Sequence, residues 1–498
     1  MGDEQHTRLA LLRFSGEIGT KARATRLQFR QRLVQNLRDA LASHGLSARL
    51  EVSHERIFVE LPQHGPDPTD SDALRDHPLA RIFGIQSLSC VERRPITSLD
   101  AIVSSGVALF GDRVRAKRFA VRARRVGNRG VGALRSREVQ VALGAALLPR
   151  SAGVDLSAPD VTVHIELAEH GTSFFSERIG GPGGLPLGVE GAAVALLSGG
   201  FDSAVAAWQM LKRGVALDYV FCNLGGPLHL HGTIRVAKVL ADRWSYGDRP
   251  QLHAIDFEPV AEALRASTQK RYWQILLKRL MLRAAAAVGR RGRAAAIVTG
   301  EAVGQVSSQT LQNLTVISRA TDETILRPLI GFNKEDIIAA AGRIGTFELS
   351  KVIREYCALV SRRPATRAGL GVVEREEAKL DPAVLERAID SRSVVDLREL
   401  ALESLERPEI SVERLPEKAV LIDLRPLEQY RSGHHPDALH LDFARALEAF
   451  PEFERGHTYV LSCEFGWLSA HLAQRMRRAG FDAYHFRGGQ RALMRAAP

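Results

Sequence analysis

The chain has 498 residues, with 68 Lys and Arg against 57 Asp and Glu and a formal net charge of +11. Its length predicts three or four domains, and its positive excess favours an anionic macromolecular partner over a neutral one. It contains no apolar run of the ~18 residues that span a bilayer, and its N-terminus lacks a signal peptide's apolar core, so we expect a cytoplasmic protein with no membrane partner.

The first residues alternate strand-like and helix-like patterns. Apolar runs predict strands over Leu9–Phe14 and Ile57–Leu61, and a long basic pattern between them predicts a helix across Lys21–His44. The segment Pro62–Asp76 is rich in Pro, Asp, Ser and His, which is typical of a linker. A second set of elements follows, with a short helix at Asp72–Phe83, strands at Leu88–Arg93 and Asp160–Leu167, and a helix at Leu99–Phe110.

Positive charge concentrates between Arg113 and Arg137, where ten residues are Lys or Arg and none is acidic. Cationic and apolar residues alternate through RVRAKRFAVRARRVGNRG, as in a strand with one packed face and one solvated face. A solvated face alone would explain most charge runs, but a stretch of one sign favours phosphate contacts and therefore nucleic acid. The expected RNA-binding residues are Arg113, Arg115, Lys117, Arg118, Arg122, Arg124 and Arg125.

A glycine-rich turn, Ser198–Ser203, joins the apolar run Ala193–Leu197 to the helical pattern Ala204–Lys212. Such a strand, turn and helix N-terminus exposes several backbone N–H groups that can bind phosphate oxygens. The turn lacks the Lys of the G-x-x-x-x-G-K-[ST] phosphate loop, so it is not that motif. A purely structural turn is the plain alternative.

Strands and helices alternate after this turn, which predicts a parallel sheet covered on both faces, with ligands at the carboxyl ends of its strands. We expect the strands at Leu217–Cys222, Gln251–Phe257 and Ala294–Val298. The stretches expected to line the crevice are Phe221–Gly232, Gly300–Leu314 and Arg327–Ile337. The mixed-charge segment Val373–Leu405 favours a solvated helical connector without chemistry.

A new pattern of strands and helices starts at about Ser411. Here Cys463 follows the apolar strand Tyr459–Ser462 and precedes a helical pattern at Leu468–Arg478. Backbone amides at a helix N-terminus stabilise a thiolate and lower the thiol pKa below its free value of ~8.5. A small core residue is the common alternative for a lone cysteine. The four scattered cysteines of the chain predict neither a disulfide framework nor a CxxC metal site.

The hexapeptide SGGFDS at Ser198–Ser203 resembles the PP-loop of ATP-dependent adenylating enzymes, which cleave ATP between its α and β phosphates. This resemblance implies ATP and Mg²⁺ as cofactors. It assigns Ser198, Gly199, Gly200 and Ser203 to the leaving pyrophosphate. Asp202 becomes the catalytic carboxylate and the expected Mg²⁺ ligand, because the departing charge needs a hard cation held by oxygen atoms.

The C-terminal part resembles a rhodanese domain, in which a loop cysteine carries sulfur as a persulfide. The matching residues are Asp423, Arg425, Tyr430, the G-H-x-P-x-A pattern at Gly433–Ala438 and Cys463. In combination with the PP-loop and the basic N-terminal half, the whole chain resembles the tRNA 4-thiouridine synthetases almost from end to end. Further matches are GEIGTKARATRLQFRQRL, LKRLMLRAA, TGEAVGQVSSQT, RPLIGFNKEDII and the cysteine stretch Arg354–Thr366.

This family resemblance implies a multi-domain α/β protein. The expected parts are a ferredoxin-like domain (residues 1–70), a THUMP RNA-binding domain (71–178), a parallel-sheet PP-loop ATP pyrophosphatase domain (179–395), a linker (396–411) and a rhodanese-like α/β domain (412–498).

The resemblance also assigns roles to single residues. It places ATP contacts at Leu196, Leu197, Lys278, Gly300 and Gln309, although an exposed basic residue is the plain alternative for Lys278. Lys334 would assist adenylation. Cys463 would carry the persulfide, and Cys357 would resolve it by forming a disulfide that a reductant then resets.

The implied reaction adenylates O4 of uridine at tRNA position 8 and replaces that oxygen with sulfur, giving 4-thiouridine. The implied partners are tRNA and a cysteine desulfurase as sulfur donor. A homodimer and a sulfur-carrier protein of thiazole synthesis for thiamine remain open. Two alternatives also remain: a persulfide carrier for thiazole synthesis with secondary RNA binding, and an RNA-binding module without catalysis.

One motif departs from the family pattern. The cysteine loop of the family reads Cys-x-Arg-Gly-Val-Met-Ser, whereas this chain has Cys463, Glu464, Phe465, Gly466, Trp467, Leu468 and Ser469 in sequence. The missing arginine removes one source of thiolate stabilisation beside the sulfur.

Overall fold

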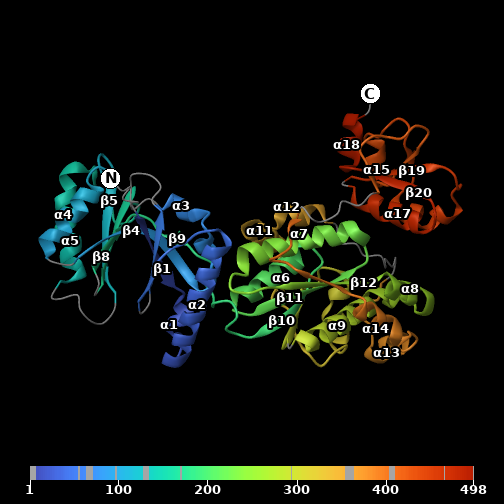
Figure 1. The fold of residues 1–498 in the computed structure, drawn as a ribbon, viewed down its shortest axis with the longest axis horizontal. Coiled ribbons are helices and arrows are strands. Elements are labelled where there is room, and N and C mark those ends of the chain that lie inside the picture. The colour runs from blue at the N-terminus through green and yellow to red at the C-terminus, as the bar shows by residue number, and fades with distance from the viewer. Residues whose placement is uncertain are drawn as a thin grey trace. The chain divides into compact units, whose positions relative to one another are not determined.

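The computed structural model describes residues 7–53, 56–62, 71–95, 98–126, 134–168, 171–292, 294–353, 364–402, 410–464 and 466–496. The chain forms two compact units (Figure 1). Unit 1 holds the described residues up to Glu190, together with Lys212–Gly214 and Tyr246–Asp248, and unit 2 holds the others. None of the helices in these ranges is long and apolar enough to cross a membrane.

Unit 1 is built on one nine-stranded sheet. Its strands are β1 (Thr7–Phe14), β2 (Leu50–Val52), β3 (Arg56–Pro62), β4 (Ile85–Arg94), β5 (Arg118–Arg125), β6 (Gly153–Val154), β7 (Val161–Ala168), β8 (Gly171–Phe175) and β9 (Ile179–Gly180). Their order is β2-β3-β1-β4-β8-β7-β5-β6, and β9 pairs with β4. Strand β4 makes the sheet continuous, because its earlier residues pair with β1 and its last three pair with β8.

Two helical layers cover this sheet with separate cores. Helix α2 (Arg23–Ser43) buries Phe29, Leu33, Leu37 and Leu41, which recur at helical spacing, against the apolar side chains of β1 and β3. The other layer joins α4 (Leu99–Phe110) and α5 (Ser136–Leu147), which pack on β5 and β7. The remaining short helices are α1 (Gly16–Gly19) and α3 (Asp72–Arg75).

Most elements predicted for unit 1 are confirmed, but the basic stretch is only partly a strand. The strand β5 begins at Arg118, because turns closed by Val114 N–H to Phe110 O and Lys117 N–H to Val114 O come before it. Ala116, at φ 55°, has a backbone conformation that a strand does not contain. The helix expected at Asp72–Phe83 is also shorter, since α3 ends at Arg75 and a separate 3₁₀ turn follows at Pro78–Arg81.

A single buried carboxylate organises the middle of the unit 1 sheet. Glu166 on β7 is 3% exposed and contacts the guanidinium groups of Arg13 at 2.8 Å, Arg124 at 2.7 Å and Arg56 at 3.2 Å. Burial alone would raise the pKa of Glu166, but these cations outweigh it and lower that pKa to about 2. Burial also lowers the pKa of Arg13, to about 10, so both groups are charged at neutral pH.

Unit 2 contains a six-stranded sheet of order β14-β13-β10-β11-β12-β15. Its strands are β10 (Ala192–Leu196), β11 (Ala216–Asn223), β12 (Gln251–Asp256), β13 (Ala296–Val298), β14 (Thr324–Leu326) and β15 (Ser393–Asp396). Helices cover both faces, with α7 and α11 on one side and α9 and α14 on the other (Figure 1). The helices are α6 (Phe201–Lys212), α7 (Gly226–Trp244), α8 (Glu258–Ser267), α9 (Trp273–Gly292), α10 (Leu311–Ser318), α11 (Lys334–Ile344), α12 (Phe347–Val352), α13 (Leu370–Glu377) and α14 (Pro382–Asp390).

The strand order of this sheet places a switch point beside β10. The chain moves from β10 to β11 and β12 on one side, and later adds β13 and β14 on the other side. The loops that leave β10 and β13 therefore separate at their carboxyl ends, where open parallel sheets bind ligands. This arrangement agrees with the predicted parallel sheet.

The segment Val373–Leu405 is not an all-helical connector. It contains α13 and α14, but it also supplies β15, which pairs antiparallel with β12 from Ser393 opposite Ala254 to Asp396 opposite Gln251. The prediction failed because β15 has only four residues, two exposed and two half-buried, and so leaves no apolar period in the sequence.

A second parallel sheet lies in the last part of unit 2, in the order β16-β20-β19-β17-β18. Its strands are β16 (Ser411–Val412), β17 (Val420–Asp423), β18 (Leu439–His440), β19 (Thr458–Ser462) and β20 (Asp482–Phe486). Its helices are α15 (Leu427–Arg431), α16 (Phe443–Ala449), α17 (Trp467–Arg478) and α18 (Gly489–Ala496). Apolar side chains from β17, β19 and α17 form its own core, so this sheet has the architecture of a separate α/β domain.

Replacing Glu166 with Gln should destabilise unit 1 by about 3 kcal/mol, since it leaves several guanidinium groups without a counter-charge. Hydrogen–deuterium exchange of the β5 and β7 amides would report the loss. Because the folded pKa is depressed, the wild-type ion pairs contribute fully above pH ~4.5 and are lost as pH falls towards 2, and Glu166→Gln should remove this dependence. Glu51→Gln, at a half-exposed pair with Arg93, is the control. Equal exchange in both variants would refute this role.

Candidate functional site

The glycine-rich turn leaves β10 and holds its shape through its own serines. Ser203 Oγ accepts the Ser198 N–H at 3.1 Å and donates to the Gly200 carbonyl at 3.2 Å. Gly199 has φ 78°, and a Cβ there would lie 2.9 Å from Thr233 Oγ1 and from the Ile353 side chain. Both its conformation and its neighbours therefore require glycine.

A cavity of about 560 Å³ opens at the switch point beside this turn. Its inner wall is apolar and includes Val220, Phe221, Met281 and Ile317. Such a wall suits a planar aromatic ring, and the polar turn suits phosphate. The predicted ATP-site residues on its lining are Leu196, Leu197, Ser198, Asp202, Ser203, Lys278, Gly300 and Gln309, whereas Gly199 and Gly200 lie behind it in the turn.

The carboxylate of Asp202 lies in the first turn of α6 and contacts two other loops. Lys334 Nζ, from the start of α11, lies 2.8 and 2.9 Å from its two oxygens. The Gln305 amide donates to Oδ2 at 2.9 Å. Asp202 is only 7% exposed, so these contacts orient a largely desolvated carboxylate. No local sequence pattern linked either residue to Asp202 or distinguished Gln305 from its neighbours.

A second buried carboxylate, Glu301, also lines the cavity. It accepts from Lys278 Nζ at 2.9 Å, from Arg327 Nε at 2.8 Å and from Thr299 Oγ1 at 3.2 Å. Burial raises the pKa of Glu301, but the two cations outweigh it and lower the pKa below its ordinary value. Lys278 is therefore not simply an exposed cation. The sequence did not reveal Glu301 as the partner of Lys278, or Arg327 as a second cation on Glu301, because the strands β13 and β14 bring them together.

His229 on α7 supports the turn from outside. Its Nε2 lies 3.1 Å from the Ser198 carbonyl oxygen, and because a carbonyl only accepts, Nε2 carries the proton. Burial lowers the pKa of His229, so the ring is neutral at neutral pH. The ring meets Phe221 edge to face at 4.9 Å. The predicted crevice segment contained His229, but no local pattern separated it from its neighbours.

Backbone spacing at Gly300 is as tight as at the turn. A Cβ at this position would lie 2.7 Å from the Asp202 carbonyl carbon and the Ser203 nitrogen. The loop after β13 therefore packs directly on the start of α6. This contact keeps the two loops of the switch point in register.

Cys463 stands at the carboxyl end of β19, as predicted. It is 4% exposed, and its Sγ lies 3.5 Å from Ser469 Oγ on α17. The Gln490 N–H donates to the Cys463 carbonyl at 2.9 Å, and a Cβ at Gly489 would lie 2.6 Å from that same oxygen. The loop therefore packs against the start of α18. This fixes the backbone on which the thiol is carried.

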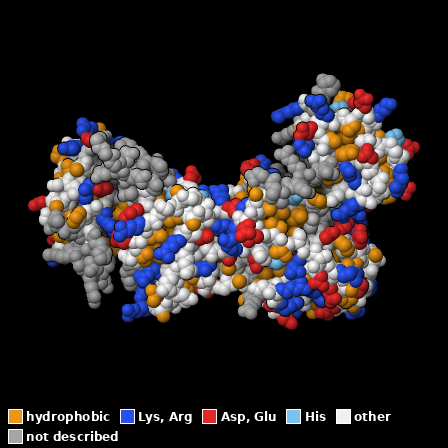
Figure 2. All heavy atoms as spheres, viewed as in Figure 1, with side chains coloured by type: hydrophobic (Ala, Val, Ile, Leu, Met, Phe, Trp, Pro, Cys, Tyr) orange, Lys and Arg blue, Asp and Glu red, His pale blue; other side chains and the backbone are white. Residues whose placement is uncertain are grey.

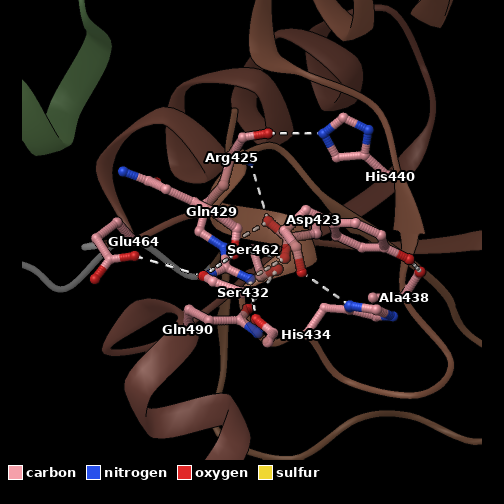
Figure 3. A network of polar contacts seen from close by, with 12 residues as sticks. Asp423, Arg425, Gln429, Ser432, His434, Ala438, His440, Ser462, Glu464 and Gln490 are labelled. Carbon is pink, nitrogen blue, oxygen red and sulfur yellow. Dashed lines mark hydrogen bonds and ion pairs between the residues drawn. The ribbon is translucent and has the colours of Figure 1, made fainter. Parts of the chain in front are cut away.

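An ion pair next to this loop lies at the end of β17 (Figure 3). Asp423, whose strand β17 runs beside β19, is fully buried and accepts from Arg425 at 2.7 and 3.0 Å. Arg425 also donates to the Gly433 carbonyl at 2.7 Å, while His440 Nε2 lies 2.9 Å from the Arg425 carbonyl. The Asp423 and Arg425 side chains of the D-x-R pattern thus hold the loop around Gly433 in place.

Glu464, next to the cysteine, lies 3.7 Å from Arg425 (Figure 3). Burial lowers the pKa of Arg425, but its bonds to Asp423 and the nearby Glu464 outweigh this and raise it above the ordinary value. Glu464, at the variable position of the family loop, is therefore held by a cation. Phe465, the next residue, lies outside the described residues.

The cysteines differ in their surroundings. Cys90 and Cys222 are buried, and burial raises the pKa of Cys222 well above its ordinary value, which leaves it a protonated thiol. Cys357 lies outside the described residues, so its pairing with Cys463 stays a prediction.

The predicted RNA-binding cations are not a patch free of carboxylates. Arg118 pairs with Asp155 at 3.0 Å and Arg124 with Glu166 at 2.7 Å, so folding brings acidic partners that the local sequence does not contain. Figure 2 likewise shows acidic and basic side chains close together on the visible face.

The other cations of this group differ in whether they contact the protein. Lys117 and Arg125 are exposed, and no ion pair is recorded for either within the described ranges. Arg122 donates to the Leu156 carbonyl, Arg113 donates to Ser176 Oγ at 2.8 Å, and Arg115 pairs with the exposed Asp112.

Four family models match consecutive parts of the chain. They are the ferredoxin-like domain of ThiI (residues 9–89), the THUMP domain (97–176), the thiamine biosynthesis protein ThiI (188–381) and the rhodanese-like domain (409–496). The predicted fold classes are therefore confirmed, in the predicted order.

Related proteins match over nearly the whole chain. A tRNA sulfurtransferase of Pyrobaculum aerophilum is 37% identical over 481 residues, covering 96% of each chain, and one of Shewanella woodyi is 36% identical, covering 94% of this chain and 97% of its own. A crystal structure of a 4-thiouridine synthetase–RNA complex with bound ATP superposes with a TM-score of 0.67 at 29% identity, covering 78% of this chain and 99% of that one. With identities above one third over almost its full length, this chain belongs to the tRNA sulfurtransferase family.

Proposed function

We propose that this protein converts uridine at tRNA position 8 to 4-thiouridine, using ATP for activation and Cys463 as the sulfur carrier. The observation that carries the proposal is the convergence of Asp202, Lys334 and Gln305 at a cavity whose wall suits a nucleotide. The names of its relatives and the ATP-bound, RNA-bound structural neighbour support it. A tRNA substrate also favours a cytoplasmic location.

In the first step, O4 of the uracil attacks the α-phosphorus of ATP, and the bond to the β-phosphate breaks. The leaving pyrophosphate would bind at the N-terminus of α6, where the Ser198–Ser203 turn ends, as anions do at helix N-termini. Lys334 supplies positive charge beside Asp202, which stabilises charge that develops on the phosphates.

The predicted Mg²⁺ would be held by Asp202 and the phosphates of ATP. No group of three or more His, Cys, Asp or Glu among the described residues forms a complete protein cage for a metal. This fits Mg²⁺, which commonly takes only one or two carboxylates and completes its shell with phosphates and water. When bound, the ion would neutralise phosphate charge.

In the second step, the outer sulfur of a Cys463 persulfide attacks C4 of the uracil, and AMP leaves. Cys357 then attacks Cys463 Sγ, which releases the sulfur on the base and leaves a Cys357–Cys463 disulfide. A dithiol reductant then reduces this disulfide to two thiols and is itself oxidised to a disulfide. A cysteine desulfurase supplies the persulfide sulfur in this proposal.

RNA binding in this proposal falls to unit 1. Lys117 and Arg125 are the exposed cations best suited to phosphate contacts, and the arginines with protein partners can position the backbone around them. A homodimer remains a prediction of the family resemblance.

A second candidate function is sulfur delivery for thiazole synthesis. The thiamine biosynthesis description of the matching family model and the separate core of the Cys463 sheet favour it. A sulfur-carrier protein would then receive the persulfide sulfur without use of the ATP cavity.

Asp202→Asn should lower the rate of AMP and pyrophosphate formation with tRNA by about 10²- to 10³-fold, because the turn then lacks the anion that orients Lys334. Release of labelled pyrophosphate in a single turnover measures this. Asp242→Asn, which removes a surface partner of Lys238 on α7, should have no effect. Unchanged pyrophosphate release by Asp202→Asn would contradict the catalytic role of Asp202.

His229→Leu should raise the KM for ATP about tenfold, because the Ser198 carbonyl loses the N–H donor that supports the turn. His229→Gln keeps an amide donor of similar reach and should recover most of the affinity. Steady-state kinetics with varied ATP would separate the two variants. If both behave like wild type, the imidazole only fills space.

Cys463→Ala should still transfer AMP from ATP to tRNA but should form no 4-thiouridine. The label of α-phosphate-labelled ATP should then accumulate on the tRNA, while nucleoside mass analysis shows unmodified uridine. Cys90→Ala removes a buried thiol from the other unit and should keep thiolation. Thiolation by Cys463→Ala would contradict the persulfide role, and wild-type sulfur delivery without ATP would favour the thiazole function.

A further inference from the structure

Four exposed apolar side chains lie on the two loops whose residues Gln305 and Lys334 contact the Asp202 carboxylate. Val303, Val306, Ile330 and Phe332, here named the apolar rim, are between 39% and 48% exposed. They belong to two loops, one after β13 and one after β14. Large apolar side chains that remain exposed together at a reaction site indicate a surface that binds something.

Contacts within the loops place the apolar rim at the reacting end of the cavity. The loop with Val303 and Val306 carries Gln305, which binds Asp202. The loop with Ile330 and Phe332 leads into Lys334, which binds the same carboxylate.

The backbone joins the two loops directly, because the Val303 N–H donates to the Ile330 carbonyl at 3.0 Å. Buried Leu329 anchors the second loop, and its carbonyl accepts the Phe332 N–H at 3.0 Å. Val306 also lines the cavity itself. The rim is therefore a folded surface, and its residues are held in place at the cavity mouth.

Adenine and phosphate do not need these side chains. The buried wall with Val220, Phe221 and Ile317 already offers an apolar site for adenine, and the Ser198–Ser203 turn offers N–H groups for phosphate. The rim carries no charge, so it is unsuited to phosphates of an RNA backbone. Its one aromatic ring is suited to the flat face of a base.

We propose that the apolar rim binds the target pyrimidine after it leaves the RNA stack, with Phe332 stacking on the ring. This inference rests on the proposed function. O4 must reach the α-phosphate next to Asp202, and a base within a stacked RNA cannot place its O4 there. An extruded base exposes two apolar faces, which the rim covers at the one place where the reaction requires them.

The test measures transfer of AMP from α-phosphate-labelled ATP to tRNA in single turnovers with the full chain. Phe332→Ala should slow transfer roughly tenfold to a hundredfold, which is the effect of losing one base–aromatic stack. Phe332→Trp should keep most activity, and Phe332→Leu should fall between the two. ATP affinity and tRNA affinity should both stay within about twofold of wild type. Val394→Ala, on β15 and equally exposed, is the matched control.

A second measurement locates the base directly. Product tRNA with 4-thiouridine at the target position should photocrosslink to peptides that contain residues 303–306 or 330–332, and Phe332→Ala should reduce this yield.

Several results would overturn the inference. The first is AMP transfer by Phe332→Ala at the wild-type rate, and the second is a loss of ATP or tRNA affinity as large as the loss of AMP transfer. The third is crosslinking only to peptides outside the rim. The fourth is normal AMP transfer with slow sulfur delivery, which would assign the rim to the Cys463 loop. If wild-type protein transfers no AMP to tRNA, the proposed function itself fails.

Discussion

The contact between Asp202 and Lys334 depends on the strand order of the central sheet. Because β11 and β13 lie on opposite sides of β10, the loops beyond β10, β13 and β14 all end at one edge of the sheet. Asp202, Gln305 and Lys334 come from three such loops. Along the chain, Gln305 lies 103 residues and Lys334 lies 132 residues from Asp202. The Asp202 side chain is largely buried whereas the Lys334 side chain is 41% exposed, so the buried charge depends on accurate placement of Lys334 and therefore on the connectivity of the sheet.

Sequence patterns predicted the parts of the molecule whose signals are local. Three local elements appear where expected: the strand before Ser198, the Gly-rich turn and the strand before Cys463. Each can be predicted from an apolar run or from glycines within a few neighbouring residues. The partners of Glu301 could not be predicted in this way, because Lys278 on α9 and Arg327 after β14 reach it only in the folded domain. For the same reason the carboxylates beside β5 escaped notice, because β7 brings Glu166 from forty residues away. The family resemblance pointed to Asp202, Lys278 and Lys334, but only the tertiary structure shows which residues they contact.

The altered cysteine loop shows how a family site changes without losing its frame. Glu464, next to Cys463, lies 3.7 Å from Arg425, which is held by buried Asp423. Ser469 places a hydroxyl 3.5 Å from Cys463 Sγ. An arginine from the end of β17 thus lies beside this loop, although the loop lacks the arginine of the family pattern.

In the proposed reaction the two sheets of unit 2 carry different steps from similar positions. Asp202 follows the buried strand β10 and contacts Lys334, and Cys463 follows β19 beside Glu464, which lies 3.7 Å from Arg425. The surroundings differ as the tasks require. A nucleotide needs a large cavity with an apolar wall, whereas one sulfur atom needs only a tight loop of amides. In the proposed reaction ATP must act first, because attack of the persulfide sulfur on C4 then expels AMP in place of a poor oxygen leaving group.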